Sequence, residues 1–109
     1  MFGRKGNDLT VDVPVSFAEL ALGAEIKVHT MGGSPVTLRV PAGTPNGRTF
    51  RVKGKGVPRK DGTRGDLLVT VEVAVPAKLS SAARDAVEAF KAATEGEDPR
   101  LGLLDDKGV

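Results

Sequence analysis

Hydrophobic and polar residues alternate along much of the chain, and this alternation predicts short β-strands. In residues 8–15 one side carries only apolar residues: Leu9, Val11, Val13 and Val15. The same period recurs in four further segments, residues 24–30, 36–40, 48–52 and 66–75. Turns rich in Gly and Pro separate them, as in folds built from many short strands. Because Pro14 cannot donate a backbone hydrogen bond, we expect the end of residues 8–15 to lie at a sheet edge or where the strand leaves the sheet.

Two segments predict helices. Ser16 and Glu19 have the spacing of a capping box, and Gly23 can end the short helix that follows. A second helix is predicted over residues 80–94. Its apolar stripe comprises Ala83, Val87 and Phe90. Residues 95–109 show no sustained period, which indicates a loose tail.

Together these elements predict a mainly β protein, a two-layer β-sandwich of short strands with a short inserted helix and a C-terminal helix. We expect residues 1–78 to form a peptide-binding sandwich, residues 79–95 the C-terminal helix, and residues 96–109 a flexible acidic tail. The length of 109 residues, with 39% hydrophobic and 28% charged residues, fits a chain with a modest globular core.

The composition excludes several kinds of site. There is no Cys, so disulfides, thiol nucleophiles and Cys-ligated metals are excluded. No catalytic or metal-ligating spacing surrounds His29, which we interpret as a surface residue of a strand. We expect Asp66, just before a strand, to cap backbone amides in a turn. We therefore expect neither an enzyme nor a cofactor.

Charge is unevenly distributed. Residues 1–94 hold 14 Lys and Arg against 9 Asp and Glu, whereas residues 95–109 hold 2 against 5. Seven basic residues fall close together: Arg48, Arg51, Lys53, Lys55, Arg59, Lys60 and Arg64. They could be a solvated face, or they could bind an acidic peptide or nucleic acid. Trp and Tyr are absent and there are only four Phe, which makes base stacking, and hence a nucleic-acid partner, the weaker interpretation.

Neither a membrane span nor a signal peptide is indicated. No stretch approaches the ~20 apolar residues of a span, and the N-terminal residues MFGRKGNDLT lack an apolar run behind their basic residues. We therefore expect a cytoplasmic protein without a membrane partner.

Five apolar residues on predicted strands have two interpretations: Val11, Val13, Ile26, Val28 and Val69. They could simply form the core. A groove that is open at a sheet edge and takes an extended apolar peptide would use the same residue types. If Val28 is a wall of such a groove, its side chain should be partly exposed in the free domain.

The order of the segments resembles the second C-terminal β-domain of the DnaJ family of J-domain co-chaperones. Residues 2–95 carry the resemblance. Its most specific stretches are VPVSFAELALG, VPAGTPNG, FRVKGKGVP and RGDLLV. The family's J domain, Gly/Phe linker, CxxCxGxG zinc repeats and first β-domain have no counterpart here, and His29 is not followed by Pro-Asp. The resemblance implies a C-terminal piece of such a protein.

The same resemblance implies the function. It predicts a homodimeric domain that binds unfolded client polypeptides and serves the seventy-kilodalton heat-shock chaperone. Strand-for-strand carry-over from the family's first β-domain makes the five apolar residues named above the groove wall, and Lys53, Lys55, Arg59, Lys60 and Arg64 remain candidates for an acidic partner.

In the family, the C-terminal helix is where the dimer forms. The candidate dimerisation residues are Val87, Phe90, Leu101, Leu103 and Leu104. Val87 and Phe90 could instead pack the helix on its own sandwich, and the leucines could fold back on the domain. A further alternative is that this domain only positions and dimerises, while the missing first β-domain holds the client.

Overall fold

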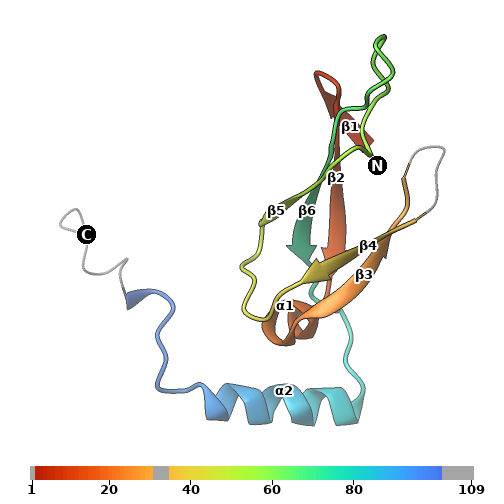
Figure 1. Cartoon of the computed structure of the whole chain (residues 1–109). Helices are drawn as coiled ribbons and strands as arrows, with labels where there is room; N and C mark the ends of the chain where they lie inside the picture. Colours follow the sequence, from red (N-terminus) through yellow and green to blue (C-terminus); the bar gives the residue numbers. More distant parts are fainter. Residues whose placement is uncertain (1, 31–34, 102–109) are drawn as a thin grey trace. The chain divides into compact units, whose positions relative to one another are not determined.

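A computed structural model describes residues 2–30 and 35–101 (Figure 1). Within these residues it contains six strands in two sheets and two short helices, which confirms the predicted mainly β sandwich. The chain divides into two compact units, Met1–Val75 and Pro76–Val109, which are described separately below. The expected functional division after residues 78 and 95 stays a prediction.

The larger sheet has four strands in the order β1-β2-β6-β5. Their bounds are Phe2–Lys5 (β1), Asp8–Val15 (β2), Thr49–Val52 (β5) and Leu67–Val73 (β6). β1 runs antiparallel to β2, and β5 runs antiparallel to β6. The central strands β2 and β6 are parallel, with Leu9 opposite Leu67 and Val15 opposite Val73. This pair therefore joins the beginning of the first unit to its end.

The smaller sheet is a hairpin of two antiparallel strands, β3 (Ala24–Val28) and β4 (Val36–Val40). Helix α1 (Phe17–Leu22) connects β2 to β3 and has the predicted capping box. The backbone amide of Glu19 donates to Ser16 Oγ (3.1 Å), and the Ser16 amide donates to Glu19 Oε1 (2.8 Å).

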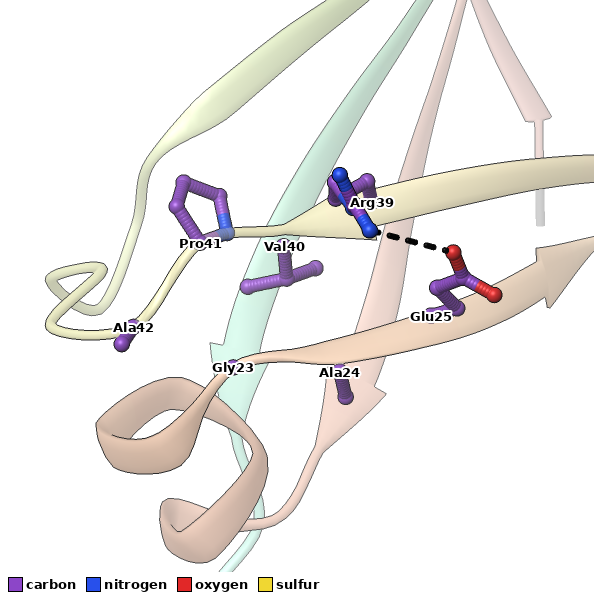
Figure 2. Close-up of a pocket in the computed structure, with 7 residues that line it drawn as sticks. All are labelled: Gly23, Ala24, Glu25, Arg39, Val40, Pro41 and Ala42. Carbon is purple, nitrogen blue, oxygen red and sulfur yellow. Dashed lines mark ion pairs between the residues drawn. The ribbon is translucent and has the colours of Figure 1, made fainter.

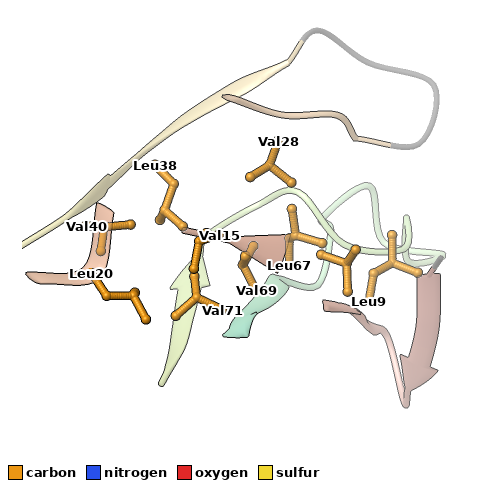
Figure 3. Packing of buried hydrophobic residues seen from close by; sticks show 10 residues of the cluster. Leu9, Val15, Leu20, Val28, Leu38, Val40, Leu67, Val69 and Val71 are labelled. Carbon is orange, nitrogen blue, oxygen red and sulfur yellow. The ribbon is translucent and has the colours of Figure 1, made fainter. Parts of the chain in front are cut away.

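The core lies between the two sheets. Figure 3 shows Val28, Leu38 and Val40 of the hairpin pointing toward side chains of the four-stranded sheet. The least exposed side chains of this cluster are Leu67, Val40, Val69 and Val71. Because every second residue of β2 and β6 contributes to the core, period-2 alternation predicted these strands correctly.

The turn after β4 is fixed to α1. The amides of Gly43 and Thr44 both donate to the carbonyl of Leu20 (2.9 and 3.1 Å). Gly23 ends the helix with φ of 87°, and a Cβ there would lie 3.0 Å from the backbone nitrogen of Ala42. The VPAGTPNG stretch therefore has a structural role, because it satisfies the last carbonyls of the helix.

In the second unit, helix α2 comprises Ser81–Ala93. Ser80 is its N-cap and accepts a hydrogen bond from the Ala83 amide at Oγ (3.1 Å). No residue of α2 is buried. The helix therefore has the predicted extent, while Val87 and Phe90 of its apolar stripe are exposed.

Candidate functional site

The predicted groove residues divide into two groups. Val11, Val28 and Val69 are buried, with exposed fractions of 8%, 5% and 0%. Val13 and Ile26 are half-buried and pack against the same core. Val28 does not have the partial exposure expected of a groove wall, because β3 points this side chain at the four-stranded sheet (Figure 3), and its burial agrees with the core interpretation. A role of these residues in peptide binding stays a prediction.

The outer edge of β2 is a second candidate, formed by backbone atoms. The amide of Leu9 donates to the carbonyl of Asp66 (2.9 Å), and the amide of Ala74 donates to the carbonyl of Val15 (2.7 Å). Backbone groups of successive residues point to opposite sides of a strand. The backbone amides and carbonyls of the odd-numbered residues of β2 therefore point toward β6. Those of the even-numbered residues point away from it.

On that outer side, the described residues of β1 pair with residues 8–11, and within residues 2–30 and 35–101 no strand pairs with this side of β2 beyond Val11. The described residues of β1 begin opposite Val11, so Asp12 and Pro14 lie beyond them. Because proline has no backbone N–H, the outward groups here are the Asp12 amide and the carbonyls of both residues. An extended peptide could add to this edge as a further strand. The only sequence signal for the edge was Pro14.

The other end of the sheet is held by an ion-pair network. Arg51 Nη1 lies 2.6 Å from Asp66 Oδ2 and 3.7 Å from Asp8 Oδ2. The Gly54 amide donates to Asp66 Oδ1 (3.0 Å), as predicted for a turn-capping carboxylate. The Arg51 guanidinium and this amide hold the pKa of Asp66 below its ordinary value, and Asp66 raises the pKa of Arg51. Arg51 is therefore engaged within the fold.

Beside this network, the β1–β2 turn and the β5–β6 loop are joined at one end of the first unit (Figure 1). The Val57 amide donates to the carbonyl of Asn7 (2.8 Å), and the Gly56 amide donates to the carbonyl of Gly65 (2.8 Å). A Cβ on Gly65 would collide with the Asn7 carbonyl. The glycine of the RGDLLV stretch therefore allows two backbone segments to approach closely.

The β5–β6 loop carries the predicted basic residues, all of them exposed: Lys53, Lys55, Arg59, Lys60 and Arg64. The loop folds back on itself as a small hairpin, with Pro58 bridged to Arg64 and the Arg59 amide donating to the Thr63 carbonyl (2.6 Å). The hydroxyl and amide of Thr63 donate to Asp61 Oδ1 and lower the pKa of that carboxyl. The positive side chains thus project from a loop whose conformation is held by hydrogen bonds.

A shallow pocket of about 430 Å³ lies where the β3–β4 hairpin meets the turn after β4 (Figure 2). Its lining is mostly apolar and includes Ala24, Val40 and Pro41. Arg39 and Glu25 also line the pocket and form an exposed ion pair across the two strands, with Arg39 Nη2 3.7 Å from Glu25 Oε2. No pattern in the sequence predicted this pocket. Its lining includes no nucleophile–base pair.

The candidate dimerisation residues are exposed wherever the structure describes them. The exposed fractions are 53% for Val87, 50% for Phe90 and 60% for Leu101. Leu103 and Leu104 lie outside the described residues. Their proposed role in dimerisation stays a prediction.

Within residues 2–30 and 35–101, no three His, Asp or Glu side chains are grouped so that they could hold a metal ion. In the same part of the chain, no helix combines the length and apolar character needed to cross a membrane.

Comparison with known proteins identifies a family. The family described as "DnaJ C terminal domain" matches residues 1–76. "Chaperone protein DnaJ 1" of Streptomyces avermitilis is 68% identical over 104 residues, and its namesake in Streptomyces coelicolor is 64% identical over 104 residues. "Chaperone protein DnaJ 2" of Cutibacterium acnes is 59% identical over 100 residues.

These matches cover 95%, 95% and 92% of this chain but only 26% of each relative. The chain therefore spans about a quarter of the length of the curated relatives that it matches. Proteins of this family are chaperones and not enzymes.

Proposed function

The chain belongs to the DnaJ C-terminal domain family of co-chaperones, and from this premise we propose that it binds unfolded polypeptide segments at the free edge of β2. The proposed site is the outward backbone of Asp12 and Pro14. A client segment in extended conformation would pair with these groups, as in other cases of strand addition.

The single observation that carries this proposal is that, within residues 2–30 and 35–101, no strand pairs with the outer side of β2 beyond Val11. The Asp12 amide and carbonyl point away from β6, and the described residues of β1 begin opposite Val11. Val13 follows Asp12 in the chain, and its half-buried side chain would supply apolar surface to the client segment. Backbone pairing would supply affinity for many sequences, which suits a binder of non-native chains.

The test removes the outward amide alone. In Asp12→Pro the ring replaces an N–H that makes no bond to β6, so the parallel pair should persist. Loss of one hydrogen bond should weaken binding of a labelled unfolded polypeptide about twofold to tenfold. The matched control is Asp12→Ala, which removes the carboxylate and keeps the amide. Binding is measured by fluorescence anisotropy, and folding by thermal unfolding of each variant.

Three results are informative. Weaker binding by a folded Asp12→Pro variant, with Asp12→Ala unchanged, supports the edge. Equal binding by both variants places the client elsewhere. No measurable binding by the unmodified chain favours the alternative, in which this domain only positions and dimerises a longer protein.

For the longer protein we propose delivery of clients to the seventy-kilodalton heat-shock chaperone in the cytoplasm, and homodimerisation through α2 and the residues after it. The names of the bacterial relatives support the first. The exposure of Val87, Phe90 and Leu101 supports the second, because burying such side chains stabilises an interface.

A further inference from the structure

The opposite edge of the four-stranded sheet carries an independent feature. β5 is the last strand in the sheet order, and within residues 2–30 and 35–101 its outer side pairs with no strand. The Val71 amide donates to the carbonyl of Arg48 (3.0 Å), so this backbone carbonyl points toward β6. Because backbone groups alternate along a strand, those of Phe50 and Val52 also point toward β6, and those of Thr49 and Arg51 point outward.

This edge leads directly into the basic loop. β5 ends at Val52, and the next residues include Lys53 and Lys55. The tip of the loop adds three more exposed cations: Arg59, Lys60 and Arg64. At the end of the adjoining strand β1, Arg4 and Lys5 are exposed as well. A row of outward backbone groups therefore continues into a group of positive side chains.

The support beneath these charges is already formed in the free protein. Asp66 fixes Arg51 and the Gly54 amide at the base of the loop. The Val57 amide is held by the carbonyl of Asn7 in the neighbouring turn. A ligand at this site would meet a largely prearranged surface, which lowers the entropic cost of binding.

We propose that the outer edge of β5 and the basic loop form a second binding site, which takes an extended acidic polypeptide segment. The segment adds a strand to β5 through Thr49 and Arg51 and places its carboxylates against the loop cations. This site lies at the other edge of the sheet from Asp12, so its existence does not depend on the client site.

Two observations favour a peptide over a nucleic acid. Outward amides and carbonyls of a strand are complementary to another extended backbone, whereas nucleic-acid binders without sequence preference rely on phosphate contacts and aromatic stacking. The aromatic residue of β5, Phe50, is half-buried, and the Arg48 guanidinium lies 5.1 Å from its ring centre.

The experiment titrates the whole chain with a fluorescent peptide of alternating Glu and Val. A Gln–Val peptide and a single-stranded RNA of matched charge serve as comparison ligands. Replacing Lys55, Lys60 and Arg64 together by Gln should weaken Glu–Val binding about tenfold, as expected for the loss of several exposed ion pairs. The same replacement at Lys27, Lys78 and Lys91 controls for net charge and should change little.

The strand edge is tested separately. Thr49→Pro removes an outward amide and should also weaken Glu–Val binding. Thr49→Val is its control, because it removes the hydroxyl contact to Thr70 Oγ1 (2.7 Å) and keeps the amide. If Thr49→Pro does not fold, hydrogen exchange of the unmodified chain answers the same question, since bound peptide should protect the amides of Thr49 and Arg51.

Binding of the Glu–Val peptide that is unchanged by the loop variant, or that gives no protection at β5, overturns the proposal. Tighter binding of RNA than of the Glu–Val peptide overturns it in favour of a nucleic-acid site. Because the Asp12→Pro variant should leave Glu–Val binding intact, a failure of this site is distinguishable from a failure of the client site.

Discussion

Asp66 contacts three separate segments of the fold. Its carbonyl accepts from the Leu9 amide, its amide donates to Asp8 Oδ1 (2.7 Å), and its carboxylate binds Arg51 and the Gly54 amide. One residue thus joins β2, β5 and the basic loop to the start of β6. The RGDLLV stretch, which marks the family, is explained by these contacts without reference to a ligand.

The lowered pKa of Asp66 predicts acid sensitivity. A carboxyl whose pKa is depressed by folding stabilises the native state above its unfolded pKa, and this contribution is lost as the pH falls through the folded value. The free energy of unfolding should therefore decrease when the pH is lowered below about 4. Asp66→Asn should be less stable at neutral pH and lose less on acidification. Urea unfolding across pH measures this, with the exposed Asp85→Asn as control; identical acid profiles for all three proteins would contradict it.

Gly65 gives a second prediction for a single residue. In Gly65→Ala the new methyl group meets the Asn7 carbonyl, so the two loops must separate. We expect a loss of about 1–3 kcal/mol in the free energy of unfolding, as for other overpacked sites. Gly96→Ala is the control, since a Cβ at Gly96 has no atom within 4 Å. Urea denaturation compares the two, and equal stability would show that the loop junction adapts at no cost.

Among the elements, the sequence predicted those whose side chains alternate or cap. Residues 8–15 match β2, and the capping box at Ser16 is present as expected. β1 was not predicted, because Phe2–Lys5 shows no alternation and gains its order from pairing with β2. The parallel pairing of β2 with β6 could not be predicted from the sequence either, because it joins distant segments and depends on the fold of the whole unit.

The candidate site was only partly predictable for a related reason. Alternation shows that Val28 and its neighbours share one face, but it does not show whether another sheet covers that face. In the structure the four-stranded sheet covers it, and Val28 is buried. The outer edges of β2 and β5 consist of backbone groups, including those of Asp12 and Thr49. The side chains of these residues do not indicate a binding edge in the sequence, and only the nearby Pro14 does.

The capping box provides a prediction at the element scale. Ser16→Ala leaves the Glu19 amide without its side-chain acceptor and should cost about 1 kcal/mol in the free energy of unfolding. Ser16→Asp retains an acceptor and serves as the control. Thermal unfolding followed by circular dichroism measures both variants. A Ser16→Ala variant as stable as the parent would mean that the turn after β4, through Gly43 and Thr44, suffices to hold α1.

At the scale of the whole molecule, the sequence leads to a prediction about the seventy-kilodalton heat-shock chaperone that we propose as a partner of the longer protein. The resemblance to J-domain co-chaperones implies that stimulation of ATP hydrolysis belongs to the J domain, whose His-Pro-Asp motif has no counterpart around His29. Adding this chain to a seventy-kilodalton heat-shock chaperone should leave its basal ATPase rate unchanged. A steady-state ATPase assay measures this, with a full-length DnaJ protein as the positive control. Several-fold stimulation by the chain alone would contradict the prediction.

The last prediction concerns self-association through α2. Val87 and Phe90 are half-exposed at helical spacing of three residues, so they lie on the same side of the helix. Burial of such side chains contributes roughly 1.5–3 kcal/mol each, which favours pairing of two copies at high concentration. Replacing both by Lys should therefore shift the chain toward monomer in sedimentation equilibrium, while Ala83→Lys, one turn earlier, should have a smaller effect. Deleting residues 96–109 separates the contribution of the leucines there. An unchanged mass after both changes would mean that α2 and the tail do not form the dimer, and that any association of this chain uses a strand edge instead.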